Sequence, residues 1–184
     1  DEKTEEYCEI KLDDFQKSLA GDPDAVYLKE LHYKAEDFVP VMACPSQVDK
    51  IRNVSELEGN VIDQVFIGSC TNGRLQAAAE VLKGKSVAPY VKLIVTPASR
   101  KVYQEAAACG AIKTLMEAGA IVTHPGCGLC CGRTGGILSD GERVVATNNR
   151  NFLGRMGTSK VEIYLASPRT AAACAVAGKI VSPV

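Results

Sequence analysis

Short apolar runs alternate with helical patterns along most of the chain. The runs are rich in Val and Ile, as in 61–68 and 91–96, and we predict strands there. Further strands are predicted at 38–43, 120–123, 143–147 and 161–166, and helices at 74–83, 100–109, 112–118 and 168–176. Continuous Val/Ile runs are typical of parallel strands that helices cover on both faces. The pattern therefore predicts an α/β fold, a three-layer α/β/α domain with a mostly parallel sheet.

Capping residues support several of these helices. Ser99 is suited to the N-cap of the helix over 100–109, because its hydroxyl can accept from a free backbone N–H. Gly110 and Gly119 follow predicted helices, as glycine often does where the chain must adopt a positive φ. Pro168 fits the first turn of the last helix.

The first thirty or so residues follow a different pattern. They are polar and acidic, with a weak helical period over 7–19 that stops at Gly21-Asp22-Pro23. We therefore predict that residues 1–34 are a linker or the remnant of a preceding domain, and that residues 35–184 form the α/β domain. The polar start at Asp1, without an initiator methionine, suggests a piece of a longer protein.

Composition and charge limit the kinds of function that the chain can have. The chain has 184 residues, 46% of them hydrophobic, and a formal charge of −1, which gives no reason to expect a nucleic-acid partner. Its apolar runs are too short to cross a bilayer, and no leader sequence opens the chain. The eight cysteines are clustered without a secretory signal, which favours metal chemistry in a reducing compartment over disulfides. We expect a cytoplasmic protein.

Three cysteines carry the strongest chemical signal. Cys70 lies in Gly68-Ser69-Cys70-Thr71-Asn72-Gly73, directly after a predicted strand, while Cys127 and Cys130 follow another strand. The carboxyl ends of parallel strands share one edge of a sheet, so these thiols are expected to converge there. A four-iron cluster usually takes four thiolates. Three would leave one iron open to act as a Lewis acid.

The residues around the cysteines suit a negatively charged cluster. Glycines flank the motifs and let the backbone approach closely with its amides turned towards the site. Thr71 and Asn72 are predicted at the start of a helix, where N–H groups and the helix dipole favour thiolates.

Two other hypotheses for the Cys127–Cys130 pair stay open at this point, a zinc site and a redox pair. A lone C-x-x-C motif also serves zinc sites and thioredoxin-like redox pairs. A structural zinc needs a fourth ligand, and no second C-x-x-C or H-x-x-x-H motif is present. A redox pair is expected at a helix start after the first strand, not late in the chain. Neither reading accounts for Cys70, but a non-enzymatic zinc- or iron-binding domain stays the alternative class.

Three separated motifs, in order, resemble the signatures of the aconitase superfamily. They are Ile67-Gly68-Ser69-Cys70-Thr71-Asn72, Pro125-Gly126-Cys127-Gly128-Leu129-Cys130 and Asn149-Arg150-Asn151-Phe152-Leu153-Gly154-Arg155. The stretch from Cys130 to Leu138 is similar to the compact large subunits of 3-isopropylmalate dehydratase and homoaconitase. The resemblance runs from about Ala25 to the C-terminus and covers the later part of such a subunit, chiefly its third α/β domain.

The resemblance implies a hydro-lyase that isomerises a 2-hydroxy dicarboxylic acid by dehydration and rehydration. It implies that Cys70, Cys127 and Cys130 hold a [4Fe-4S] cluster, that Arg150 and Arg155 bind substrate carboxylates, and that Asn149 lies near the cluster. Cys131 departs from the family pattern and is a spare thiol. The substrate implied first is 3-isopropylmalate, of leucine biosynthesis, with homoaconitase of lysine biosynthesis or a methylated-malate dehydratase as alternatives.

The same resemblance implies that some catalytic residues of the family lie outside this chain. The family's Asp–His pair and its serine base belong to other domains or to the small subunit, and neither is found here. The implied partners are therefore the small subunit, which carries the swivelling domain, and the remaining domains of the large subunit. We expect no catalytic proton donor or base in this chain, and no dehydratase activity from the chain alone.

The sequence gives weaker evidence for a functional role at several other residues. His124, at a predicted strand end, is a possible base but more often such a residue is structural. Cys44, Cys109 and Cys174 lie in apolar or Ala-rich contexts and are expected to be buried small hydrophobes. Arg74 and Arg133 flank the cysteine motifs, where they either balance cluster charge or face solvent.

Overall fold

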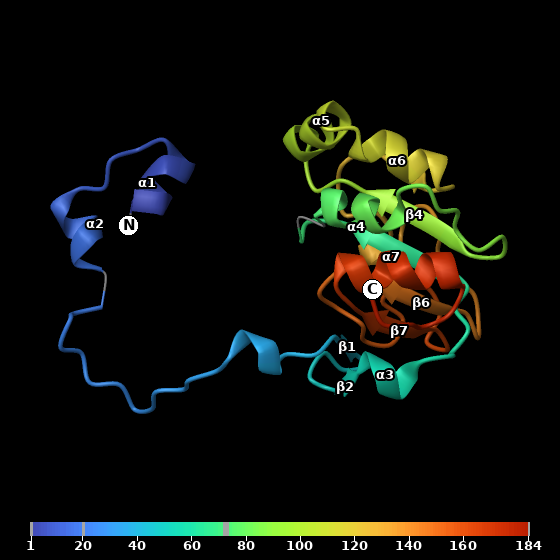
Figure 1. The fold of residues 1–184 in the computed structure, drawn as a ribbon, viewed down its shortest axis with the longest axis horizontal. Coiled ribbons are helices and arrows are strands. Elements are labelled where there is room, and N and C mark those ends of the chain that lie inside the picture. The colour runs from blue at the N-terminus through green and yellow to red at the C-terminus, as the bar shows by residue number, and fades with distance from the viewer. Residues whose placement is uncertain (1, 20, 72–73, 184) are drawn as a thin grey trace. The chain divides into compact units, whose positions relative to one another are not determined.

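The computed structural model describes residues 2–19, 21–71 and 74–183. It divides the chain into two units, Asp1–Phe38 and Val39–Val184 (Figure 1). The two are described separately below.

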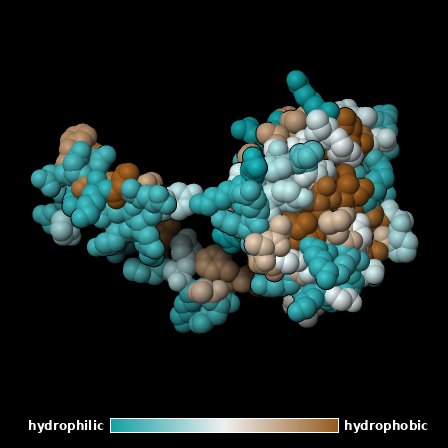
Figure 2. Space-filling view, turned by 90° about the horizontal axis from the view of Figure 1, so that it is seen from above, coloured by the Kyte–Doolittle hydropathy of each residue, from teal (hydrophilic) through white to brown (hydrophobic). Residues whose placement is uncertain are grey.

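The first unit contains three short helices, none of which buries a residue. They are α1 (Glu2–Cys8), α2 (Asp14–Ser18) and η1 (Ala35–Asp37). The prediction of one helical stretch over 7–19 is wrong, because Glu9 takes a positive φ of 54° and Asp13 caps a new helix through Gln16. Hydrophilic residues dominate the surface of this unit, with a few apolar residues among them (Figure 2). Val26 and Leu28 are almost fully exposed.

The second unit is built on a seven-stranded sheet of order β2-β1-β7-β6-β3-β4-β5. The strands are β1 (Val41–Ala43), β2 (Ile51–Asn53), β3 (Gln64–Gly68), β4 (Lys92–Thr96), β5 (Ile121–Val122), β6 (Arg143–Ala146) and β7 (Glu162–Leu165). The helices are α3 (Val54–Leu57), α4 (Leu75–Leu82), α5 (Arg100–Ala108), α6 (Ala111–Glu117), η2 (Gly128–Cys131) and α7 (Pro168–Ala177). Strands β3 to β7 run parallel, and β1 is antiparallel to both β2 and β7.

Alternate side chains of the central strands enter two cores. Val65 and Ile67 pack among residues of α4, α6 and α7. Phe66, between them, faces the opposite way and joins Leu129 of η2 and Met156. Both faces of the sheet are therefore covered, which is why the parallel strands read as continuous apolar runs. The predicted α/β fold with a mostly parallel sheet is confirmed.

Helix ends follow the expected capping. The Ser99 hydroxyl accepts from the Val102 N–H at 3.2 Å, and Ser167 caps α7, which has Pro168 in its first turn. Gly110 and Gly119 both have positive φ after helices, at 80° and 103°. Strand β2 and helix α3 were not predicted, because all three residues of β2 are exposed and carry no apolar pattern. In the described part of the chain, no helix is long and apolar enough to cross a membrane.

The order in which strands are added to the sheet changes direction at β3. Strands β4 and β5 extend the sheet on one side of β3, and β6 and β7 extend it on the other. The loops that follow β3, β4, β5 and β6 therefore leave from one edge, which we call the carboxyl edge. Open α/β sheets bind ligands at such a switch point.

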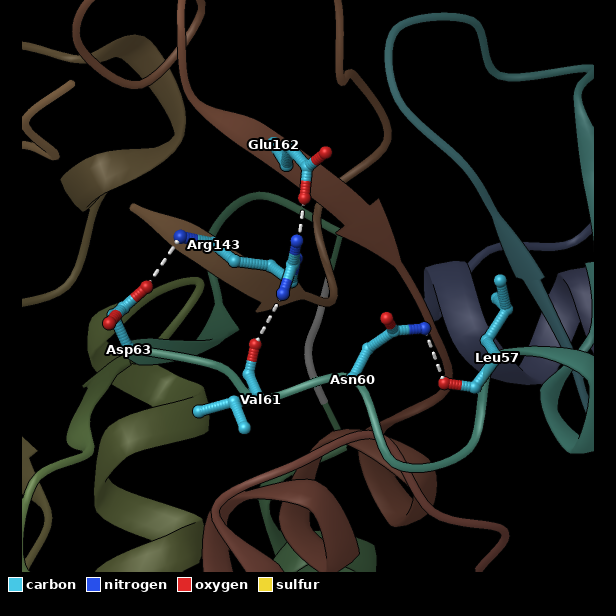
Figure 3. A network of polar contacts seen from close by, with 6 residues as sticks. All are labelled: Leu57, Asn60, Val61, Asp63, Arg143 and Glu162. Atoms are coloured by element: carbon cyan, nitrogen blue, oxygen red, sulfur yellow. Dashed lines mark hydrogen bonds and ion pairs between the residues drawn. The ribbon is translucent and has the colours of Figure 1, made fainter. Parts of the chain in front are cut away.

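The opposite edge, where β3, β4, β6 and β7 begin, is called the amino edge. The Arg143 backbone N–H donates to the Asp63 carboxylate at 2.8 Å, and the Arg143 guanidinium donates to the Val61 carbonyl at 2.8 Å and pairs with Glu162 (Figure 3). Burial lowers the pKa of Arg143, but the hydrogen bond and charge of Glu162 outweigh burial and leave that pKa raised. This network fastens three strands where they begin.

Candidate functional site

Two cysteine loops meet at Thr96, the last residue of β4. The Ser69 N–H donates to the Thr96 carbonyl at 2.8 Å, directly before Cys70. On the other side, Gly128 packs so closely on Thr96 that a Cβ there would lie 2.4 Å from Oγ1. The convergence predicted from strand ends is therefore present in the backbone that carries Cys70 and Cys127.

The Cys70 loop is also fastened to the end of β6. Gly68 N–H donates to the Thr147 hydroxyl at 2.9 Å, and the Thr71 hydroxyl donates to the Thr147 carbonyl at 3.1 Å. Gly68 has a φ of 120°, and a Cβ there would lie 1.8 Å from the Thr96 carbonyl oxygen, so only glycine fits. Cys70 itself is exposed.

The helix predicted over 74–83 is α4 (Leu75–Leu82), but Thr71 does not lie at its start. Arg74 is the N-cap of α4, in a left-handed conformation, so Thr71 lies in the preceding turn and not at the helix start. The prediction for Thr71 is wrong because its hydroxyl bonds to the carbonyls of Gly68 and Thr147 instead. Asn72 and Gly73 lie outside the described residues.

Cys127 and Cys130 lie on the short helix η2. Cys127 is its N-cap and is exposed, whereas Cys130 is only 3% exposed and packs in the core beneath the loop. The Cys130 N–H donates to the Cys127 carbonyl at 3.1 Å, which sets the spacing of the pair. The spare thiol Cys131 donates to the Gly128 carbonyl at 3.4 Å.

The segment after β6 brings two arginines to different places. Arg155 donates from Nη2 to Cys130 Sγ at 3.5 Å, and its guanidinium carbon lies 5.3 Å from the centre of the Phe152 ring. Asn149 and Arg150 are exposed and line a cavity of about 390 Å³ with Gln47 and other residues of 46–49. The described contacts join only Arg155 to a cysteine.

Unpartnered polar atoms gather in this same segment. Among residues 2–19, 21–71 and 74–183, the buried side-chain atoms without a hydrogen-bond partner are Asn148 Oδ1, Asn151 Oδ1 and Arg155 Nε. Asn151 uses its amide nitrogen on the carbonyls of Cys44 (2.7 Å) and Gln47 (3.2 Å). Buried polar atoms are normally paired, so each of these three atoms is free to form a hydrogen bond with water or with a group that binds there.

The donor set, three thiols on two loops, is of the kind that holds an iron–sulfur cluster. In the described part of the chain, no three His, Cys, Asp or Glu side chains gather as they would around one metal ion. Each thiolate of a cluster binds a different iron, so its ligands stand farther apart than those of one zinc ion. Two loops that carry the exposed thiols Cys70 and Cys127 and the buried thiol Cys130, with glycines that admit close approach, suit the larger group.

A cavity of about 430 Å³ lies beside the cysteine loop. Its lining includes Thr96, Thr123, His124, Cys127 and Cys131. The Thr96 and Thr123 hydroxyls are 2.7 Å apart and hold the ends of β4 and β5 together. His124 is exposed at the rim, and nothing in its contacts singles it out as a base.

The remaining cysteines divide into two groups. Cys44 and Cys174 are buried as predicted; burial raises the pKa of both thiols, that of Cys174 to about 11. The prediction that Cys109 is buried is wrong, because it caps the C-terminus of α5 at the surface. Arg74 and Arg133 are both exposed.

Three threonines at strand ends were missed in the sequence. Thr96, Thr123 and Thr147 tie the loops of the carboxyl edge to one another. The available signal was their position, each at the end of a Val/Ile/Ala strand and before a glycine-, proline- or asparagine-containing loop.

Comparison with known proteins gives consistent matches. The family described as "Aconitase family (aconitate hydratase)" matches residues 50–178. The homoaconitase large subunit of Thermus thermophilus is 54% identical over 168 residues, which are 90% of this chain and 40% of that protein. The 3-isopropylmalate dehydratase large subunits 1 of Thermotoga maritima and Methanopyrus kandleri are 52% and 50% identical over the whole chain, which spans 45% and 44% of them. The chain thus spans less than half the length of these relatives.

Proposed function

Because this chain belongs to the aconitase family, we propose that it is the cluster-bearing part of the large subunit of an iron–sulfur hydro-lyase. The reaction removes water from a 2-hydroxy dicarboxylic acid and adds it back with the hydroxyl on the adjacent carbon. The observation that carries the proposal is the meeting of the Cys70 and Cys127–Cys130 loops at Thr96.

Cys70, Cys127 and Cys130 would hold a [4Fe-4S] cluster through three thiolates. With three protein ligands, the group supplies Lewis-acid chemistry at an iron that is open to a substrate oxygen. The chain's own contribution is to position the thiols. Thr96 and Thr147 fix the loops, and Gly68 and Gly128 allow them to lie this close.

Asn149, Arg150 and Arg155 form the substrate side of the proposed site. An exposed guanidinium such as that of Arg150 can hold a carboxylate through two parallel N–H···O bonds. The unpartnered Arg155 Nε is a further donor at this edge. A charge-assisted bond of this kind contributes about 1.5–3 kcal/mol.

We propose 3-isopropylmalate as the substrate, with leucine biosynthesis as the context. The matched relatives are named for two reactions at nearly equal identity, so homoaconitase is the alternative, followed by a methylated-malate dehydratase. The relatives are named large subunits, so a small subunit is the proposed partner. Proton transfer belongs to that partner and to other large-subunit domains, and the isolated chain is expected to be inactive.

Two further parts of the proposal concern the chain's surroundings. Residues 1–34 are proposed to be a linker or part of a preceding domain, because none of their helices buries a residue. The eight cysteines are all free in the structure, and a thiol-ligated cluster is best kept in a reducing compartment, for which we propose the cytoplasm.

The test is anaerobic reconstitution of the chain with iron and sulfide. We expect visible charge-transfer absorption with about four irons and four acid-labile sulfides per chain. Cys70→Ser, Cys127→Ser and Cys130→Ser should each lose most of it. Cys109→Ser is the matched control, an exposed thiol outside the site, and Cys131→Ser tests the spare thiol beside it. Both should reconstitute like the wild type.

The competing classes give different results in the same experiment. A zinc-binding domain would take up zinc without acid-labile sulfide, and a thiol–disulfide protein would reduce insulin without metal. Full absorption in Cys70→Ser would remove Cys70 from the ligand set. Measurable dehydratase turnover by the chain alone would contradict the proposed division of labour.

A further inference from the structure

Cys130 differs from the other two proposed ligands in its surroundings. Cys70 and Cys127 are exposed, whereas Cys130 is 3% exposed and packs with Leu129, Met156 and Phe66. A buried anion is costly unless a hydrogen-bond donor or an opposite charge lies against it. A thiolate at Cys130 therefore needs a partner from the protein more than a thiolate at Cys70 does.

Arg155 meets that need. Its Nη2 is 3.5 Å from Cys130 Sγ, and its guanidinium lies against the Phe152 ring. Across the described residues, the ion pairs join other side chains and none involves Arg155. The guanidinium therefore carries a positive charge that no carboxylate of the described chain balances.

The backbone holds these two side chains in place. Gly132 has a φ of 66°, and a Cβ there would lie 2.6 Å from the Arg155 carbonyl oxygen. The segments that carry Cys130 and Arg155 thus touch through their main chains. One residue on, Leu138 N–H donates to the Met156 carbonyl at 3.0 Å. The main chains that carry Arg155 and Cys130 are therefore held close together beside the contact between the two side chains.

We propose that Arg155 is a positioning residue for the cluster, acting through the Cys130 sulfur, in addition to its proposed place on the substrate side. This rests on the proposed function. A charged N–H···S bond stabilises negative charge on the sulfur, so it favours the reduced cluster and slows loss of the ligand. The guanidinium has five N–H donors, and one suffices for the sulfur.

The test compares matched arginine variants of the reconstituted chain. Arg155→Met removes the charge and the donor but keeps a long apolar side chain, and Arg150→Met makes the same change at an exposed position. We expect Arg155→Met to lower the cluster's reduction potential and to speed iron loss to a chelator roughly tenfold. Arg150→Met should change neither. Arg155→Lys retains the charge and should give an intermediate potential.

The outcomes separate the two proposals. If wild-type chain takes up no iron and sulfide, the proposed function fails and this inference fails with it. If wild type and Arg155→Met form clusters of equal potential and equal lifetime, the inference alone is overturned. If Arg155→Met does not fold, as judged by circular dichroism, Arg155→Lys decides: a wild-type potential and lifetime overturn the inference, and a lowered potential supports it.

Discussion

The two edges of the sheet are built from similar residue types but differ in how their polar groups are used. At the amino edge, Arg143, Asp63 and Glu162 pair with one another and with backbone groups (Figure 3). At the carboxyl edge, Asn148, Asn151 and Arg155 each bury a side-chain atom that has no partner among the described residues. The paired groups of the amino edge hold strands together, whereas the three unpaired atoms can still bond to water or to a ligand.

The backbone shows the same contrast. The carboxyl edge has Gly68 and Ser69 at positive φ in succession, and a Cβ built on Gly68 or Gly128 would overlap Thr96. At the amino edge, Gly141 also has a positive φ of 82°, but nothing lies within 4 Å of a Cβ built there. Gly68 and Gly128, at the edge with the cysteines, therefore have no room for a side chain, whereas Gly141 at the amino edge does. The predictions below test whether this difference is energetic as well as geometric.

The largest effect is expected from Gly68→Ala. The new methyl group would overlap the Thr96 carbonyl and force a φ of 120° on alanine, so we expect a loss of more than about 3 kcal/mol in unfolding free energy. Gly141→Ala is the control, with strain but no overlap, and should lose about 1–2 kcal/mol. Urea denaturation measures both. Equal losses would mean that the carboxyl edge can relax and that the contrast is only apparent.

The next prediction concerns the stability contributed by the buried thiol of Cys174. Burial raises the pKa of Cys174 to about 11, from an ordinary value of 9.0. Below pH 9 both folded and unfolded thiols are protonated; between pH 9 and 11 only the unfolded thiol ionises, so stability falls as pH rises. The fall is expected to reach about 2–3 kcal/mol. Cys174→Ala, compared with wild type from pH 8 to 11, should lose this component. An unchanged pH profile would show that Cys174 is not protected.

A smaller effect is expected at the amino edge. Arg143→Met removes the bond to the Val61 carbonyl and the pair with Glu162, and should cost about 1–2 kcal/mol in stability because the side chain is partly exposed. Reconstituted visible absorption should be unchanged. Arg169→Met, which removes an exposed ion pair with Glu80, is the control and should cost less than about 1 kcal/mol. Loss of the cluster in Arg143→Met would break the separation of the two edges.

The sequence predicted those parts of the fold that local pattern determines. Val/Ile runs identified β3, β4, β6 and β7, and the order of cysteines after strands predicted that their loops converge. Strand β2 was missed because its three residues are exposed, and the helical pattern predicted over 7–19 is interrupted where Glu9 takes a positive φ. Neither feature produces a hydrophobic pattern in the sequence, so neither could be predicted from it.

The sequence predicted which residues form the candidate site but not how their side chains contact one another. Motif order pointed to Cys70, Cys127, Cys130 and the segment 149–155. It could not indicate that Arg155 contacts Cys130 while Arg150 stays exposed, because that depends on Gly132 meeting the Arg155 carbonyl across the fold. The linking role of Thr96 likewise comes from tertiary packing. Side-chain partners set by such long-range contacts leave no trace in local spacing.

The central claim is that the carboxyl edge holds a cluster by three thiolates and leaves one iron for a hydroxy acid. Mössbauer spectroscopy of the chain reconstituted with ⁵⁷Fe, before and after addition of a 2-hydroxy dicarboxylate, tests this most directly. The account predicts that one iron in about four changes its signal and the others do not. A cluster whose irons are all unaffected by the acid, or iron bound without sulfide, would contradict it.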